Sequence, residues 1–352
     1  MNDFLCSTFG GRRHKRTKRF SSIRESTNRA NQIKRAAERE QKFAFSKKML
    51  YLCSRKQPNN KLNMKTFIYL FLTFCFLACA NAQPKSSTST AEATDSAVVS
   101  VPEPAPFPTV VCETPLPEGY VRDTAPAGSW ADYLRHLPLR PEGTPVYHYN
   151  GNPSYWSGYA YAVIDMEIGD RDIQQCADAI IRLRAEYLYA QKRYDDIHFN
   201  FTNGFNCVYS RWAKGERVRV RDGMYTSWYP SASEDYSYDT FRKYLDMVFN
   251  YAGTASLSKE LRKADIHDLH VGDIFMEGGF PGHAMIVVDV AIDPSTGDRA
   301  FLVAQSYMPA QDIHIISAWG DKPWFFVKDF LEAEYIDLRS WEFLLNQVQS
   351  FE

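Results

Sequence analysis

This sequence lacks several features that would narrow its class at once. Of the seven cysteines among its 352 residues, only Cys112, Cys176 and Cys207 lie beyond residue 82. Because three is an odd number, at least one of these thiols stays unpaired or pairs between chains, and their spacings match no zinc-ribbon or haem motif. Beyond residue 82 there is no internal repeat and no apolar stretch long enough to span a membrane. The sequence is therefore neither a repeat array nor a chain that crosses a membrane several times.

An excess of one charge is also absent from the whole chain, which has 41 Lys and Arg against 42 Asp and Glu. The balance hides two opposite segments. Residues 1–63 hold 17 basic and 4 acidic residues, whereas residues 64–352 hold 24 basic and 38 acidic. A basic segment can bind nucleic acid or a membrane surface. The larger, acidic segment has no basic patch, so we expect no nucleic-acid partner.

A signal peptide is predicted 63 residues inside the sequence. Met64 precedes an almost unbroken apolar run of 14 residues, 67–80, which is too short to span a bilayer comfortably. Ala80 and Ala82 then form the small-x-small site of a leader peptidase, with Gln83 as the new N-terminus. We therefore expect a signal peptide at 64–82 and a basic extension at 1–63 that is disordered or lies upstream of the true start. A real basic tail on a membrane-anchored protein is the alternative.

Two modes of export stay open. Residues 76–79 read Phe-Leu-Ala-Cys and are close to a lipobox, so Cys79 is a candidate lipid anchor and the only expected contact with a membrane. We expect an exported protein, either periplasmic or attached to the outer membrane. Residues 83–115 are rich in Ser, Thr, Ala and Pro and are predicted to form an extended linker. Residues 116–352 are long enough to form a single globular domain.

This domain is predicted to be α+β, with helices followed by an antiparallel meander. Alternating apolar residues predict strands, and apolar residues spaced by three and four predict helices. Residues 284–288 are apolar without alternation, which predicts a strand buried on both faces. Asp172 and Gln175 resemble a capping box at the start of a helix. The expected helices are 173–192, 238–251 and 257–263, and the expected strands are 159–166, 198–202, 217–221, 274–276, 284–288, 300–305 and 314–316.

Three polar residues at the ends of these elements suggest nucleophilic catalysis. Cys176 falls in the first turn of a helix, where the helix dipole is expected to lower the pKa of a thiol. His283 stands between a Gly-rich loop and a buried strand, where it can accept the proton of that thiol. Gln305 ends the next strand and can hold the imidazole in one tautomer, and Ser306 and His314 are weaker candidates for this role.

Each of these residues also has a structural interpretation. A cysteine on the inward face of a helix is usually a small buried hydrophobe. His283 can cap its turn, and Gln305 can satisfy buried backbone groups. Asp178 would disfavour a thiolate if it faced Cys176, but the helical spacing is expected to point it elsewhere.

The order of these motifs resembles the NlpC/P60 superfamily of papain-like amidases. The residues that carry the resemblance are QCAD at 175–178, GDIF at 272–275, GHAMIVV at 282–288 and Gln305. It implies Cys176 as nucleophile, His283 as general base and Gln305 as orienting residue. It also implies a papain-like helix packed on an antiparallel meander. The separation of 107 residues from Cys176 to His283 then requires a helical insertion at 195–265.

The region 116–350 also resembles a family of exported bacterial proteins, the domain of unknown function 4846. QCADAIIRLRAEYLY, FNFTNGF and AQSYMPAQDIHI carry this second resemblance. It implies export and a bacterial envelope, and it implies no activity.

Two further hypotheses concern metals and sugars. The set His267, Asp268, His270 and His283 offers metal ligands, although the leading hypothesis expects no metal and no cofactor. Tryptophans can stack on sugar rings, although most are expected to be in the core. These tryptophans are Trp130, Trp156, Trp212, Trp228, Trp319 and Trp324. The leading hypothesis is an exported cysteine hydrolase or acyltransferase acting on an amide or ester bond of an envelope peptide or glycan. The alternative is a non-catalytic envelope or glycan-binding protein on the same scaffold.

Overall fold

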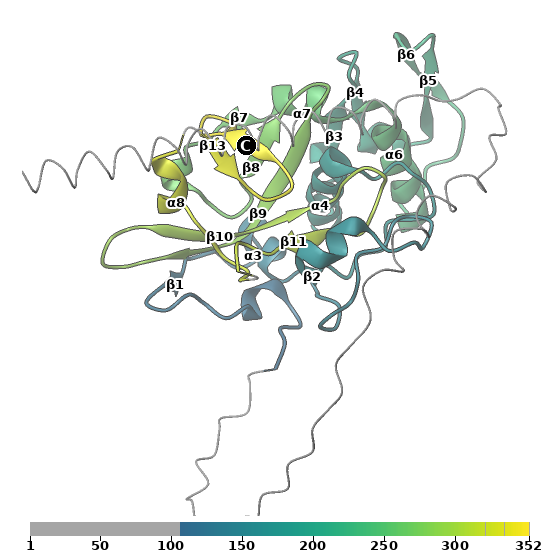
Figure 1. Cartoon of the computed structure of the whole chain (residues 1–352). Coiled ribbons are helices and arrows are strands. Elements are labelled where there is room, and N and C mark those ends of the chain that lie inside the picture. The colour runs from purple at the N-terminus through teal and green to yellow at the C-terminus, as the bar shows by residue number, and fades with distance from the viewer. Residues whose placement is uncertain (1–105, 321, 334, 352) are drawn as a thin grey trace, which may run out of the picture. The chain divides into compact units, whose positions relative to one another are not determined.

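The computed structural model describes residues 106–320, 322–333 and 335–351 (Figure 1). These residues form a mixed α+β domain with several helices and one main antiparallel sheet, as predicted. The basic extension at 1–63, the signal peptide at 64–82 with Cys79, and most of the linker at 83–115 lie outside the described residues. Within the described part of the chain, no helix combines the length and the apolar character needed to cross a membrane.

The main sheet has the strand order β2-β11-β10-β9-β8-β15-β7, and β1 and β12 pair with β9 and β10. All of its ladders are antiparallel, with a bulge between β9 and β10. The strands are β1 (Val121–Arg122), β2 (Ala160–Val163), β7 (Arg262–Lys263), β8 (Ile274–Glu277), β9 (His283–Ile292), β10 (Arg299–Gln305), β11 (His314–Ile316), β12 (Phe325–Phe326) and β15 (Val348–Ser350).

The helices begin where polar side chains cap them. Ser237 Oγ accepts a hydrogen bond from Thr240 N at the start of α6, which has the predicted bounds. At the start of α4 the cap is Gln175, whose N–H donates to Asp178 Oδ2, so the capping box expected at Asp172 is wrong. Gln175 Nε2 does donate to Asp172 Oδ1, at 3.0 Å, but this bond lies before the helix. The helices are α3 (Trp130–Arg135), α4 (Cys176–Ala190), α5 (Tyr209–Ala213), α6 (Tyr238–Tyr251), α7 (Thr254–Glu260) and α8 (Lys328–Leu331), with 3₁₀ turns η1 (Val111–Glu113), η2 (Tyr155–Tyr159), η3 (Tyr194–Asp196) and η4 (Ile266–Asp268).

Strand β9 is buried on both faces, as its unbroken apolar run predicted. Ala284 and Ile286 belong to the apolar cluster that includes α3, α4, α6 and α7. Met285 and Val287 belong to a second cluster, on the other face, with α8 and the hairpin β13 (Tyr335–Asp337) and β14 (Glu342–Leu344). Each fully buried large apolar side chain contributes roughly 1.5–3 kcal/mol to the free energy of folding. The sheet therefore forms the middle layer of the domain.

The folded part extends further toward the N-terminus than the predicted boundary at residue 116. Phe107 packs on Tyr161 with ring centroids 5.6 Å apart, and Val111 is fully buried. Leu139 N donates to Thr109 O at 2.7 Å. The last residues of the predicted linker thus pair with the domain, because Phe and Val interrupt its Pro-rich composition with buriable side chains.

The insertion between Cys176 and His283 is not purely helical, which corrects the expected helical insertion at 195–265. It contains helices α5, α6 and α7, and it also contains two antiparallel hairpins. These are β3 (His198–Asn200) with β4 (Asn206–Val208), and β5 (Glu216–Arg221) with β6 (Tyr225–Pro230). The aromatic and β-branched residues of these segments favour strands.

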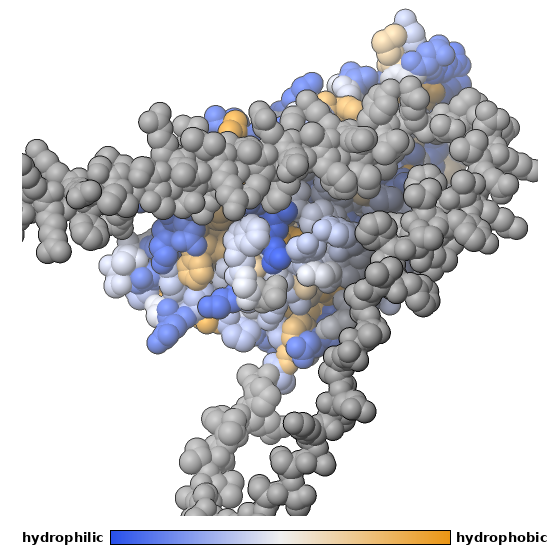
Figure 2. Space-filling view, in the orientation of Figure 1, coloured by the Kyte–Doolittle hydropathy of each residue, from blue (hydrophilic) through white to orange (hydrophobic). Residues whose placement is uncertain are grey.

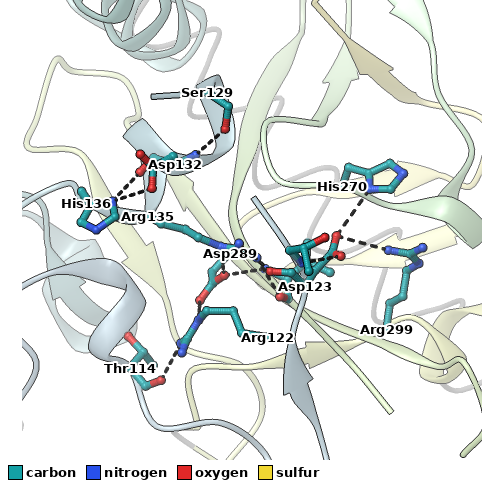
Figure 3. A network of polar contacts seen from close by, with 12 residues as sticks. Thr114, Arg122, Asp123, Ser129, Asp132, Arg135, His136, His270, Asp289 and Arg299 are labelled. Carbon is teal, nitrogen blue, oxygen red and sulfur yellow. Dashed lines mark hydrogen bonds and ion pairs between the residues drawn. The ribbon is translucent and has the colours of Figure 1, made fainter. Parts of the chain in front are cut away.

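A buried ion cluster ties the N-terminal segment to β9 (Figure 3). Asp289 is fully buried and accepts hydrogen bonds from Arg122 Nε and Arg135 Nε, both at 2.6 Å. The same guanidinium groups donate to the backbone carbonyls of Thr114, Asp123 and Val290. Because both arginines have partners, this burial of charge is tolerated. The cluster fixes the strand that begins at His283.

The outer surface is mixed in character. On the side of the domain seen in Figure 2, hydrophilic and hydrophobic residues are interspersed, and the hydrophobic residues form small separate groups. This mixture is usual for a protein surface that faces water.

Candidate active site

Cys176 lies in the first turn of α4, as the sequence predicted, although the helix begins at Cys176 itself rather than at Ile173. As a residue Cys176 is partly exposed, unlike Cys207, which is buried, but its sulfur is enclosed by protein atoms. Backbone N–H groups of Ala177 and Ala284 face its sulfur. Ala284 directly follows His283 at the start of β9, so the helix start and the strand start meet at this sulfur.

The expected lowering of the thiol pKa is wrong. Burial and, to a lesser extent, the negative charge of Asp178 together raise the pKa of Cys176 to about 12. The N–H groups of Ala177 and Ala284 lower it, but by less. Asp178, which was expected to point elsewhere, therefore does influence the sulfur. Burial also raises the pKa of Asp178 to about 8, and its Oδ1 has no hydrogen-bond partner within the described residues.

The ring of His283 is enclosed by aromatic side chains. It lies 4.8 Å from the ring of Tyr307 and 5.1 Å from that of Trp341, and the residue is only 2% exposed. Trp341 is held in place by a 2.8 Å hydrogen bond from its Nε1 to Glu277 Oε2. Burial lowers the pKa of His283 to about 4, although the hydrogen bond to Gln305 opposes this shift. His283 is therefore neutral near pH 7.

A chain of hydrogen bonds fixes the tautomers of two histidines. His314 Nδ1 lies 2.9 Å from the carbonyl oxygen of Asp312, which can only accept, so Nδ1 carries the hydrogen. His314 Nε2 then has a lone pair and accepts from the Gln305 amide nitrogen at 3.3 Å. This orients the amide, and Gln305 Oε1 must accept from His283 Nε2 at 2.8 Å. Ser340 Oγ donates to the same oxygen at 2.8 Å.

The consequence is that His283 Nδ1 carries a lone pair rather than a hydrogen. A neutral imidazole with a free nitrogen lone pair is the form that a general base requires. The sequence correctly placed Gln305 beside His283. The hydrogen bond of the ring goes to this glutamine, which argues against the interpretation of His283 as a cap of its own turn.

The thiol and the base adjoin the same backbone segment without being hydrogen-bonded to each other. Among the described residues, the only hydrogen bond of the His283 side chain is the one to Gln305. Tyr307 links the two groups, because its ring packs on His283, and burial followed by the nearby Cys176 raises the pKa of its hydroxyl. Catalytic hydrogen bonds are often long or poorly aligned before a substrate binds.

Three residues of this site were missed by the sequence analysis, namely Tyr307, Ser340 and Trp341. Ser340 and Trp341 lie between β13 and β14, about 35 residues beyond Gln305, and nothing local in their sequence points to His283. Tyr307 could have been identified from the sequence, because it follows Gln305 by only two residues. Ser306 donates instead to Gln311 O at 2.8 Å, which gives it a structural role.

The alternative metal ligands do not come together. His270 contacts Asp268 and Asp123, whereas the ring of His283 hydrogen-bonds to Gln305. In the described part of the chain, no group of three or more His, Cys, Asp or Glu side chains is arranged to hold a metal ion.

Most of the six tryptophans were expected in the core, but only two of them are buried. Trp212 and Trp324 are buried, whereas Trp319 is 60% exposed. Trp130, Trp156 and Trp228 are partly exposed.

Comparisons with known proteins identify a family but no activity. Searches among curated proteins and among solved structures found no match. The resemblance to the NlpC/P60 superfamily is therefore supported by no relative. The model of the domain of unknown function 4846 matches residues 111–350, which is most of the chain and nearly all of its described part. The chain belongs to the family defined by this domain of unknown function.

Proposed function

We propose that this domain is an exported cysteine hydrolase or acyltransferase on a papain-like scaffold. Its substrate is an amide or ester of an envelope component, a peptide or a glycan. Cys176 is the nucleophile, His283 is the general base, and Gln305 orients the base. The location is periplasmic or at the outer membrane, where Cys79 is the candidate lipid anchor. The observation that carries the proposal is the hydrogen-bond chain that leaves His283 Nδ1 as a proton acceptor. The next residue, Ala284, presents its N–H to the sulfur of a cysteine at a helix start.

The reaction starts from a neutral pair, because the thiol has a raised pKa and the imidazole a lowered one. His283 Nδ1 takes the thiol proton while the sulfur bonds to the substrate carbonyl carbon. Backbone N–H groups at the start of α4 stabilise the oxyanion. Collapse of the tetrahedral adduct expels the amine or alcohol, which takes the proton from His283. The thioester is then cleaved by water in a hydrolase, or by a second nucleophile in an acyltransferase.

Gln305 keeps the imidazole productive throughout this sequence. When His283 becomes positively charged, its Nε2–H still donates to the amide oxygen of Gln305. A neutral amide can stabilise the imidazolium only weakly, so the charged state is short-lived and the proton passes on to the leaving group. Ser340 holds the same oxygen and prevents the amide from rotating.

The rival is a binding protein on the same scaffold, without catalysis. The raised pKa of Cys176 favours it, because the thiolate is nearly absent near pH 7. Under this hypothesis Cys176 packs as a small hydrophobe and the histidines form a buried polar network.

Acylation of Cys176 separates the two hypotheses. The full chain is incubated with p-nitrophenyl acetate at pH 7, and the modified cysteine is identified by peptide mass spectrometry. We expect rapid acetylation of Cys176 and a loss of about 10²–10⁴-fold in its rate for His283→Gln. Cys112, which is partly exposed, and Cys207, which is buried, are controls within the same chain. Acetylation of Cys176 no faster than that of Cys112, or unaffected by His283→Gln, would favour the binding protein.

A further inference from the structure

A strip of aromatic rings runs from the candidate active site to the surface. His283 contacts Tyr307, and Tyr307 contacts Trp156 with ring centroids 5.3 Å apart. Trp156 contacts Tyr155 at 5.4 Å and Tyr159 at 5.6 Å. The strip therefore begins beside Cys176 and continues outward through η2.

The outer end of the strip is exposed although it consists of large rings. Tyr155 is 73% exposed and Trp319 is 60% exposed. Arg339 lies over Tyr159 at 4.7 Å and over Trp319 at 5.1 Å, and so joins Trp319 to the strip. Clustered exposed aromatics on a folded domain commonly mark an interaction site.

The rings are held in place before any ligand binds. Ser154 Oγ accepts from Trp156 N at 3.1 Å and fixes the start of η2, while Ser157 Oγ donates to Val146 O at 3.1 Å. Arg339 Nη1 donates to the carbonyls of Ser317 and Ala318. Rigid aromatic side chains lose little conformational entropy on binding.

The chemistry of the strip favours one class of ligand. Its exposed members are Tyr and Trp, not aliphatic residues, and the hydroxyls of Tyr155 and Tyr159 meet at 3.0 Å along its edge. A surface that alternates ring faces with hydrogen-bonding groups suits a molecule with an apolar face and a polar rim. A pyranose ring has this form, with C–H groups on its faces and hydroxyls around its edge. An apolar peptide would be matched better by aliphatic side chains.

We propose that this strip binds the sugar of an acylated or peptide-bearing glycan, and so places an amide or ester next to that sugar at Cys176. This inference rests on the proposed function for the position of the scissile bond, but the binding of sugar by the strip stands by itself. Tyr307 adjoins the reacting groups, and Tyr155 and Trp319 bind the glycan further out.

Calorimetric titration of the full chain with the tetrasaccharide of N-acetylglucosamine tests the inference. We expect measurable binding that is weakened at least tenfold in Tyr155→Ala and in Trp319→Ala. Tyr225→Ala is the matched control, because Tyr225 is 70% exposed but lies on β6, outside the strip, and it should bind as the wild type does. These are exposed positions, so the variants should keep the wild-type Tm.

A second variant separates this inference from the catalytic proposal. Cys176→Ser should bind the tetrasaccharide as tightly as the wild type, even if acylation of Cys176 is never observed. The inference is overturned if the wild type does not bind at millimolar sugar, or if Tyr155→Ala and Trp319→Ala bind normally. Displacement of the sugar by an equal concentration of a sugar-free alanine-containing peptide would show that the class of ligand is wrong.

Discussion

The two buried histidines should make the domain sensitive to acid. Burial lowers the pKa of His283 and of His314 to about 4, whereas an unfolded histidine titrates near 6.5. Between these values the unfolded chain binds more protons than the folded domain, so the free energy of unfolding falls as pH falls. The loss begins near pH 6.5 and is complete below pH 4. From pH 8 to pH 5 the linkage relation gives about 2 kcal/mol for each histidine.

His314→Gln isolates one of these contributions. Glutamine can donate to Asp312 O and accept from Gln305, so the variant keeps part of the network but removes a titrating group. We expect it to be less stable than the wild type at pH 8. Its loss of stability between pH 8 and pH 5 should be smaller by about 2 kcal/mol. Buried acids such as Asp178 titrate in both chains and cancel in the comparison.

Urea unfolding at pH 8, 7, 6 and 5 measures the difference. His198→Gln is the matched control, because His198 is exposed at the start of β3. That variant should follow the wild-type pH dependence. If His314→Gln also follows it, the ring of His314 titrates as it would in water. The hydrogen bonds from His314 through Gln305 would then no longer establish that His283 Nδ1 carries the lone pair.

Two other substitutions have effects on stability with a definite sign. Asp178 has a raised pKa of about 8, so it destabilises the fold increasingly as pH rises from about 4 to 8. Asp178→Asn should therefore raise the Tm at pH 8.5 by at least about 3 °C, and this gain should shrink toward pH 4. An equal gain in Tm at pH 8.5 and pH 4 would contradict the raised pKa of Asp178. Asp289→Asn leaves the buried Arg135 and the partly exposed Arg122 without a full counter-charge, and it should cost about 3–5 kcal/mol in urea unfolding. A cost under about 1 kcal/mol would show that the cluster is hydrated.

Local patterns were enough to predict the elements around the candidate site. The helix containing Cys176, the β8–β9 hairpin and the placement of His283 at its strand start all follow from periodicity and turn residues. The neighbouring strand β10 brings Gln305 to His283, because consecutive antiparallel strands pair side by side. These features involve short separations along the chain, where sequence reasoning is strongest.

The surroundings of the site could not be predicted in the same way. Ser340 and Trp341 reach His283 from the β13–β14 hairpin, and Trp156 reaches Tyr307 from a turn about 150 residues earlier. The sequence periodicity of these segments does not indicate which strand of the sheet they cover. Such contacts depend on how the C-terminal hairpin and η2 pack on the sheet, which is a property of the whole fold.

The wrong prediction for the pKa of the Cys176 thiol also arises from the packing of distant segments. The free energies involved show which effect is larger. A helix N-terminus stabilises a negative charge by about 0.3–1 kcal/mol in ordinary settings. A rise in the pKa of Cys176 from 9.0 to about 12 corresponds to about 4 kcal/mol against the thiolate. Burial therefore outweighs the helix start by several-fold. The sequence reveals a helix in this segment because apolar periodicity is local. It does not reveal how many atoms from β9 and from Tyr307 exclude water from the sulfur, and that exclusion determines the direction of the shift.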